Sequence, residues 1–251
     1  MAHVIPFHGT LYNPATVGDV RQVVAPPYDI IDASLQKTLH DRHPNNVIRL
    51  ELGYEQPGDT TGDNKYLRAA GALKEWLKSG ALRRDDKPAI YYHTIEYQPP
   101  YSAPGTPTKV FKGFLSTVEL EEFGSGKIYP HENTRAAAKT DRFNLLEACR
   151  ANFSAIISLY SDPQNDVLTL IERSIASDKP RIDFQDDVGF RQRLWSVTDP
   201  AVLAKVVEIM HTKQLFIADG HHRYETALNY RRARRQQAGA PSGPQPYDNV
   251  L

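Results

Sequence analysis

One stretch of the chain reads Leu215-Phe216-Ile217-Ala218-Asp219-Gly220-His221-His222-Arg223-Tyr224-Glu225-Thr226-Ala227. Its first residues form a short apolar run, which is typical of a buried strand. Glycine adopts the backbone angles of a tight turn at little cost, so Gly220 permits an abrupt change of direction and the close approach of a ligand. We therefore expect a strand over residues 214–218, a turn at Asp219-Gly220 and a helix that begins near His221.

This predicted turn combines side chains and backbone groups that bind anions. The first turn of a helix has N–H groups without partners inside the helix, and the helix dipole places positive charge there. Arg223 is suited to bind phosphate oxygens through two parallel hydrogen bonds, and His221 and His222 add donors or proton acceptors near neutral pH. Asp219 is a candidate Mg²⁺ ligand or general base. The alternative is that Asp219 caps the helix and the other side chains are ordinary surface residues.

The rest of the chain alternates between short helices and strands. Apolar spacing predicts helices over residues 63–80 and 134–151, another after Asp162-Pro163 and a fourth opened by Asp199-Pro200. Asp63 is the candidate N-cap of the first helix and Gly80 its stop. Residues 90–97, 110–118 and 155–160 are expected to be strands, the first two as an antiparallel pair with a long connection. The predicted fold class is α+β, with a mixed sheet and flanking helices.

Two parts of the chain are distinguished by their motifs. Residues 1–160 are expected to form an N-terminal α+β part, and residues 161–251 a part that carries the Asp-Gly-His-His-Arg turn. A single domain is the alternative, because no linker separates the two. Residues 247–251 resemble the beginning of another strand, so we expect the chain to be incomplete at its C-terminal end.

The composition excludes several classes of protein. The 251 residues include 30 Lys and Arg against 30 Asp and Glu, so the net charge is zero. A protein that coats nucleic acid or an anionic membrane usually carries a basic excess, so neither partner is expected. The single cysteine, Cys149, excludes an intramolecular disulfide. No signal peptide and no run of about 18 apolar residues is visible, so the prediction is a cytoplasmic protein.

Several ordered motifs resemble those of one bacterial and archaeal family, domain of unknown function 1015. The similar segments lie along the whole chain, at residues 25–29 (Ala-Pro-Pro-Tyr-Asp), 43–46 (His-Pro-Asn-Asn), 129–134 (Tyr-Pro-His-Glu-Asn-Thr), 139–142 (Lys-Thr-Asp-Arg), 193–195 (Arg-Leu-Trp) and 218–228. Members of that family run well beyond residue 251, and they tend to have histidine where this chain has Gln192. The family itself implies a fold more than an activity.

The same turn is similar to the phosphate-binding motif of the ParB/sulfiredoxin superfamily. Sulfiredoxin has Gly-Cys-His-Arg where this chain has Gly220-His221-His222-Arg223, so His221 replaces the reactive cysteine and sulfinic-acid reduction is not expected. ParB proteins have Gly-Glu-Arg-Arg at this place. The free-serine kinases of the superfamily have an Asp-Gly-His turn, which Asp219-Gly220-His221 matches. This last similarity implies phosphorylation of a small molecule.

A second group of candidates lies between residues 131 and 142. His131-Glu132 begins like the helix of a zinc protease, but Arg135 occupies the place of the second histidine, which excludes that class. His131 and Glu132 are expected to reach the nucleotide site, with Glu132 as base or metal ligand; the alternative is a helix start capped by Asn133 or Thr134. Lys139 and Arg142 share a helix face and are candidates to contact an anion, with surface ion pairs as the alternative.

One tempting motif is rejected. Gly124-Ser125-Gly126-Lys127 resembles part of a P-loop, but the first glycine would fall at Glu121, and Ile128 stands where Ser or Thr is needed. A turn with a solvated lysine is the better interpretation.

These observations together predict a nucleotide-dependent phosphotransferase that acts on a small hydroxyl-bearing metabolite, with ATP or ADP and Mg²⁺ as cofactors. The residues expected to bind the nucleotide are Gly220, His222, Arg223, His131, Lys139 and Arg142. The residues expected to be catalytic are Asp219, His221, His222 and Glu132, and Asp219 and Glu132 are the expected metal ligands. One alternative is a ParB-like nucleotide-binding switch without turnover. Another is an inactive fragment or a scaffold whose site is completed by a further segment.

Overall fold

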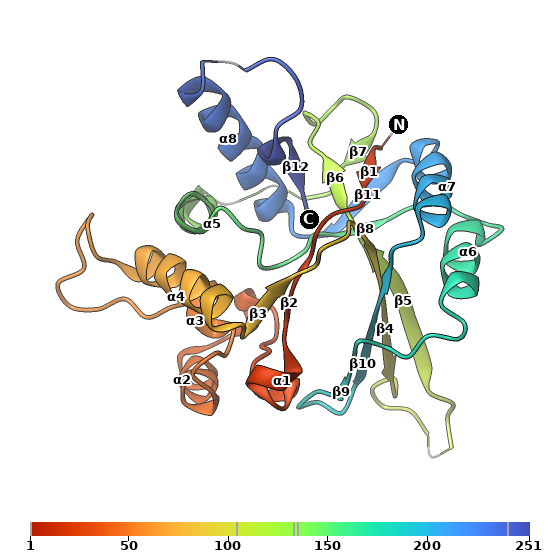
Figure 1. Ribbon diagram of the computed structural model, residues 1–251, viewed down its shortest axis with the longest axis horizontal. Coiled ribbons are helices and arrows are strands. Elements are labelled where there is room, and N and C mark those ends of the chain that lie inside the picture. The colour runs from red at the N-terminus through yellow and green to blue at the C-terminus, as the bar shows by residue number, and fades with distance from the viewer. Residues whose placement is uncertain (1, 104, 133, 135, 240) are drawn as a thin grey trace.

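The structure of the protein is a computed structural model, which describes residues 2–103, 105–132, 134, 136–239 and 241–251 (Figure 1). It combines helices with several sheets and confirms the mixed α+β class. The α-helices are α1 Pro14–Val17, α2 Ala33–Arg42, α3 Ile48–Glu51, α4 Lys65–Ser79, α5 Ala136–Cys149, α6 Asp166–Ser174, α7 Pro200–His211 and α8 His221–Gln237. Short 3₁₀ turns are η1 Val20–Gln22, η2 Tyr28–Ile30 and η3 Pro246–Asp248.

The largest sheet is antiparallel and has the strand order β5-β4-β10-β9. Its strands are β4 Ile90–Tyr97, β5 Lys109–Leu115, β9 Ile182–Gln185 and β10 Arg191–Val197. In β4 and β10, Tyr92 and Trp195 are paired in register, and their rings pack with centroids 5.7 Å apart. The predicted strand over residues 90–97 and its antiparallel pairing with the following strand are confirmed.

Two three-stranded sheets and one two-stranded sheet complete the β structure. One has the order β1-β6-β12, the second β7-β11-β8, and the third pairs β2 with β3. The strands are β1 Val4–Ile5, β2 Thr10–Tyr12, β3 Leu82–Arg84, β6 Thr117–Glu119, β7 Ile128–Tyr129, β8 Ile157–Leu159, β11 Leu215–Asp219 and β12 Asn249–Val250. In the second sheet β11 is parallel to β7 and antiparallel to β8. Strands from residues 1–160 therefore pair with strands from residues 161–251 in three of the four sheets.

One predicted strand proved to be two. The segment 110–118 divides at Ser116 into β5, which pairs with β4, and β6, which pairs with β1 and β12. The apolar pattern continues across the break because both strands face the same core, so periodicity alone does not reveal it. The predicted strand over 155–160 is shorter, β8, and the last residues form β12.

Side-chain caps explain where the helices begin. Asp199 accepts hydrogen bonds from the N–H groups of Ala201 and Val202, at 2.8 and 3.4 Å, as predicted for α7. In α4 the cap is Asn64 rather than Asp63, because the Asn64 side chain accepts from the N–H groups of the first turn. Helix α4 ends as expected at Gly80, whose φ is 78°. Asn133 and Arg135, which belong to the predicted start of α5, lie outside the described residues.

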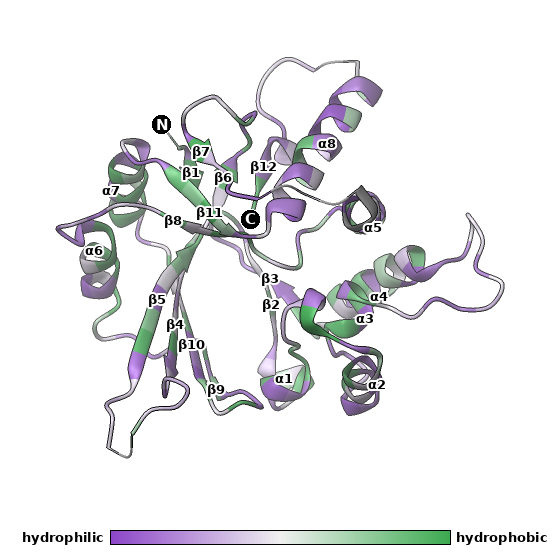
Figure 2. Ribbon diagram, turned by 180° about the vertical axis from the view of Figure 1, so that it is seen from behind, coloured by the Kyte–Doolittle hydropathy of each residue, from purple (hydrophilic) through white to green (hydrophobic). Residues whose placement is uncertain are grey.

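The largest core cluster lies between the sheets and the helices α6, α7 and α8. Its fully buried members include Ile171, Val206, Met210, Ile217 and Tyr224. Figure 2 shows α7 and β11 predominantly hydrophobic and α8 predominantly hydrophilic. A second cluster lies around Trp76, beneath α3, α4 and β3. In the part of the chain that the structure describes, no helix combines the length and apolar character needed to cross a membrane.

Candidate functional site

The strand, turn and helix predicted around Gly220 are present. Strand β11 is irregular between Ile217 and Asp219, and the chain then turns at Gly220, whose φ is 94°, into α8. A β carbon at Gly220 would lie 3.0 Å from Nε of Arg223, so the arginine side chain lies directly over the glycine. Both the positive φ and this close approach favour glycine at the position.

The guanidinium group of Arg223 contacts the turn that precedes its helix and a neighbouring segment. Its Nη2 forms an ion pair with the Asp219 carboxylate, and its Nη1 donates to the backbone oxygen of Ala155. The Asp219 side chain is 50% exposed and the Arg223 side chain 14%. Gly220, not Asp219, is the N-cap of α8, and the helix has no side-chain cap hydrogen bond. The capping alternative for Asp219 is therefore wrong, because its carboxylate is turned toward Arg223.

His131 and Glu132 lie against the beginning of α8. The backbone N–H of His131 donates to Nε2 of His221, at 3.2 Å, and the two rings meet edge to face with centroids 4.5 Å apart. Oxygens of Glu132 lie 3.6 Å from Nε2 of His131 and 3.7 Å from Nδ1 of His221. Burial is the largest cause that lowers the pKa of His221, whose side chain is only 3% exposed. The structure thus brings these three residues together, 90 positions apart in sequence.

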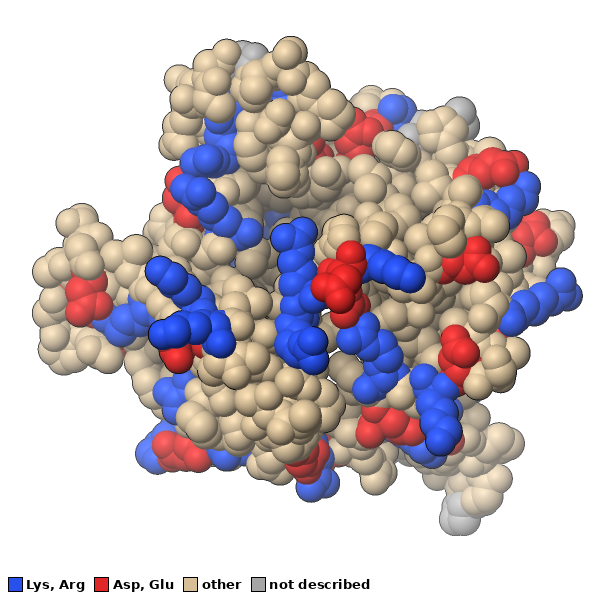
Figure 3. Space-filling model, viewed as in Figure 1, with Lys and Arg blue, Asp and Glu red and all other residues tan. Residues whose placement is uncertain are grey.

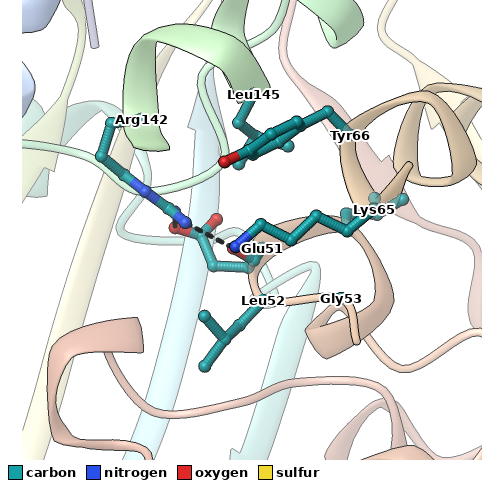
Figure 4. Close-up of a pocket in the computed structure, with 8 residues that line it drawn as sticks. Glu51, Leu52, Gly53, Lys65, Tyr66, Arg142 and Leu145 are labelled. Atoms are coloured by element: carbon teal, nitrogen blue, oxygen red, sulfur yellow. Dashed lines mark hydrogen bonds and ion pairs between the residues drawn. The ribbon is translucent and has the colours of Figure 1, made fainter. Parts of the chain in front are cut away.

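Arg142 is the most completely engaged cation of the region. Its Nη1 lies 3.0 Å from Oε1 of Glu51 and its Nη2 donates to the backbone oxygen of Glu51, at 2.9 Å. Asp141 holds the other side of the guanidinium, which lies 4.1 Å from the centre of the Tyr28 ring. Figure 4 shows Arg142 and Lys65 reaching toward Glu51 from different elements. Burial raises the pKa of Glu51, and the charge of Arg142 only partly offsets this.

Arg142 and Arg223 line one open pocket. It is open to solvent, and its lining residues are Glu51, Arg142, Leu145, Leu146, Ala151, Asn152, Phe153, Ser154, Arg223 and Thr226. Ser154 donates to the Glu51 carboxylate, at 2.9 Å. Thr226 is 2% exposed, and its buried hydroxyl has no hydrogen-bond partner among the described residues. A buried hydroxyl without a partner is costly to the fold.

Lys139 connects α5 to α8 beside this pocket. Its Nζ lies 2.6 Å from Oε2 of Glu225, the same oxygen that accepts from the Thr134 hydroxyl at 2.7 Å. Burial opposes ionisation of Glu225, but these hydrogen bonds outweigh it and lower the pKa. His222 is partly buried in the first turn of the same helix.

The motif at residues 43–46 supports the segment that leads to the motif at residues 25–29. Asn46 is completely buried and its side-chain amide donates to the backbone oxygens of Gln22 and Val24, at 2.8 and 3.1 Å. The residues 43–46 therefore hold the loop that delivers Tyr28 to Arg142.

Glu51, Ser154 and Thr226 are among the pocket residues that the sequence analysis does not identify. Thr226 follows Arg223 by three positions and so shares its helix face, a signal that could have identified it. Glu51 and Ser154 gave no such signal, because each is a single polar residue in an ordinary segment. Their role depends on contacts with residues about 90 to 100 positions away along the chain.

Other charged residues of the molecule are compensated locally. Lys127, in the rejected P-loop-like segment, pairs with Glu121 at 2.6 Å. In the basic end of α8, Arg231 and Arg232 both pair with Glu122. Figure 3 shows Lys and Arg interspersed with Asp and Glu over one face, and a hollow near its centre. No single-sign surface appears on that face.

The comparisons with known proteins are consistent with the motifs. A family model described as "Protein of unknown function (DUF1015)" matches residues 4–251. No curated protein and no solved structure matches the chain significantly. The matched range covers nearly the whole sequence and includes every motif described above, and so the chain belongs to the DUF1015 family.

Proposed function

We propose that the protein is a nucleotide-dependent phosphotransferase that acts on a small hydroxyl-bearing metabolite. One observation carries the proposal: the guanidinium groups of Arg142 and Arg223, from distant segments, line one pocket beside the first turn of α8. Guanidinium groups and helix N-termini are the groups that proteins use to bind phosphate. The buried Thr226 hydroxyl, for which the described part of the chain offers no partner, belongs to the same pocket.

The likeness of the turn to the ParB/sulfiredoxin superfamily supports the same reading. In that likeness Gly220 and Arg223 correspond to the phosphate-binding positions, and Asp219-Gly220-His221 to the turn of the free-serine kinases. The strand, the turn and the helix have the order that such a motif requires. The ion pair between Arg223 and Asp219 occupies the arginine until a stronger anion replaces the carboxylate.

The Asp219–Arg223 ion pair also suggests which residues would act in the transfer step. When a nucleotide phosphate binds Arg223, the Asp219 carboxylate is released beside the transferred group. Asp219 can then accept the proton of the acceptor hydroxyl, while the phosphoryl group passes from the nucleotide to the hydroxyl oxygen. We prefer Asp219 to His221 as the base, because Nε2 of His221 already accepts a backbone hydrogen bond and its ring is buried. His222 and Lys139 are assigned to phosphate binding, together with Gly220.

Asp219, in this turn, and Glu132, in the segment before α5, are the carboxylates that would hold Mg²⁺. Asp219 and Glu132 both offer exposed oxygens, with side chains 50% and 62% exposed. Magnesium favours one or two carboxylates together with substrate phosphates and water. When bound, the ion would neutralise charge that develops on the phosphate oxygens.

A screen for binding and turnover tests the proposal. Thermal unfolding is recorded with ATP, ADP and CTP, each with and without Mg²⁺, and phosphate transfer to hydroxyl-bearing metabolites is followed by phosphorus NMR. We expect a stabilising nucleotide and a phosphorylated acceptor. Asp219→Asn should retain nucleotide binding and lose most turnover, because the amide cannot accept the proton. Binding without transfer to any acceptor would instead favour a ParB-like switch, and full activity of Asp219→Asn would contradict the role of Asp219.

A further inference from the structure

The cluster of His131, Glu132 and His221 contains both nitrogen and oxygen ligands. One ligand atom from each residue can be chosen so that all of them lie within 4.8 Å of one another. The side chains of His131 and Glu132 are 57% and 62% exposed, whereas His221 is buried beneath them. Among the described residues this is the group of histidines and carboxylates whose geometry suits an ion.

Hydrogen bonds define which nitrogen of His131 is available. Its Nδ1 lies 2.7 Å from the backbone oxygen of Ile217, which can only accept, so Nδ1 carries the proton. The lone pair of the neutral ring is then on Nε2, the atom that lies 3.6 Å from Glu132. A histidine whose outer N–H donates to a backbone carbonyl is the usual arrangement of a metal ligand.

In His221 the ring nitrogen that accepts a hydrogen bond is Nε2 rather than Nδ1. Its Nε2 accepts the backbone N–H of His131, so in the neutral ring the proton is on Nδ1. This Nδ1 lies 3.7 Å from the second oxygen of Glu132. That distance is longer than a hydrogen bond, and a small movement of the Glu132 side chain would let its carboxylate accept from Nδ1–H of His221. His221 can in this way orient the carboxylate, but it has no lone pair left for an ion.

We propose that Nε2 of His131 and the Glu132 carboxylate bind a divalent transition-metal ion, and that His221 positions Glu132. Imidazole nitrogen favours ions such as Zn²⁺, Co²⁺ or Ni²⁺ over Mg²⁺. The inference goes beyond the proposed function, because such an ion needs no nucleotide in order to bind. Glu132 would then serve this ion rather than the Mg²⁺ that accompanies a nucleotide, and Asp219 would remain beside the transferred phosphoryl group.

The position of the site indicates what else the ion would bind. Two exposed protein ligands leave several coordination positions for water or for an oxygen of a bound phosphate. His221, which supports the ion, is the first residue of α8, and the Asp219–Arg223 pair belongs to the same turn. The ion would therefore lie beside the predicted phosphate site and not in the interior of the fold.

Titration with Co²⁺ alone tests the proposal. The full chain is titrated with Co²⁺ by calorimetry and by visible absorption, with Mg²⁺ in excess. We expect one bound equivalent, and a loss of affinity of at least about tenfold in both His131→Ala and Glu132→Gln, since each removes a direct ligand. His3→Ala is the matched control: His3 lies 3.2 Å from Glu119 and 6.3 Å from the ring of His211, a surface group of the same residue types. Its affinity should equal that of the unmodified protein.

His221 is tested through the spectrum as well as the affinity. His221→Ala should lower the affinity by about tenfold to a hundredfold, the usual effect of removing a group that orients a ligand. His221→Asn, whose amide can still donate to Glu132, should restore most of it, with an unchanged Co²⁺ absorption spectrum at saturation. A spectral shift in His221→Asn would make His221 a direct ligand and overturn its positioning role. Absence of binding, full competition by Mg²⁺, or equal affinities of His131→Ala and His3→Ala would overturn the site.

Discussion

The antiparallel sheet around β4 and the pocket between α5 and α8 are held together in different ways. Strand β4 is paired along its whole length with β5 and β10, and its first three residues are all buried. The pocket is assembled by individual side chains from distant segments, such as Arg142 with Glu51 and Lys139 with Glu225. The sheet therefore depends on its apolar residues and tolerates changes of charge. The pocket depends on a few ionic groups, some of which a ligand can replace.

Of the variants that test this comparison, a substitution of Arg142 is expected to have the largest effect on stability. Arg142→Met should lower the free energy of unfolding by about 3–5 kcal/mol, because it leaves the buried Glu51 carboxylate without its partner. Urea denaturation followed by circular dichroism measures it. The double variant with Glu51→Leu should recover much of the loss, since neither charge is then buried alone. A loss below about 1 kcal/mol in the single variant would mean that the pair contributes no more than a surface ion pair.

A core residue of the sheet gives the complementary result. Ile90 is fully buried in β4. Ile90→Ala should cost about 2–5 kcal/mol of stability, through lost burial and the cavity left behind. Nucleotide affinity at a temperature where the variant is folded should not change, because Ile90 does not line the pocket. A parallel loss of affinity would show that the two regions are not independent.

The smallest effect is expected from a titration within the sheet. His93 of β4 lies 2.9 Å from the side-chain oxygen of Gln192, and burial lowers its pKa. The unfolded chain then takes up a proton at a higher pH than the folded protein does. The contribution of His93 should therefore make stability fall as the pH decreases below about 6.5, the ordinary pKa of histidine. Unfolding measured between pH 5 and 7.5 should show a flatter profile in His93→Asn, and an identical profile would contradict this assignment.

Elements with a local signal could be predicted from the sequence. Strand β4 is identified by its aromatic and β-branched residues, and α7 by the Asp199 cap with proline after it. The end of α4 at Gly80 follows from the same local chemistry. The division of β5 from β6 could not be predicted, because it depends on which distant strands pair with each half.

The candidate site also has parts that could be predicted from the sequence and parts that could not. The turn at Gly220 has the predicted conformation, because the glycine and the apolar run before it act over a few residues. The motifs predict that His131 and Glu132 reach the turn at Gly220, with a capped helix start as the alternative, and the structure places both residues against His221. The ion pair of Arg142 with Glu51 had no signal in the sequence. Such a contact is defined by the packing of α5 on α8 and α4, and not by the residues that flank it.

Calorimetric titration of Arg223→Ala with MgATP and MgADP tests the central claim most directly. If Arg223 binds a nucleotide phosphate, the variant should lose about 1.5–3 kcal/mol of binding free energy, which is roughly tenfold to more than a hundredfold in affinity. Arg232→Ala is the matched control, because Arg232 lies on the same helix, is 57% exposed and pairs with Glu122. We predict that Arg232→Ala binds like the unmodified protein while Arg223→Ala binds far more weakly. Equal affinities of the two folded variants would contradict the assignment of the turn as a phosphate site.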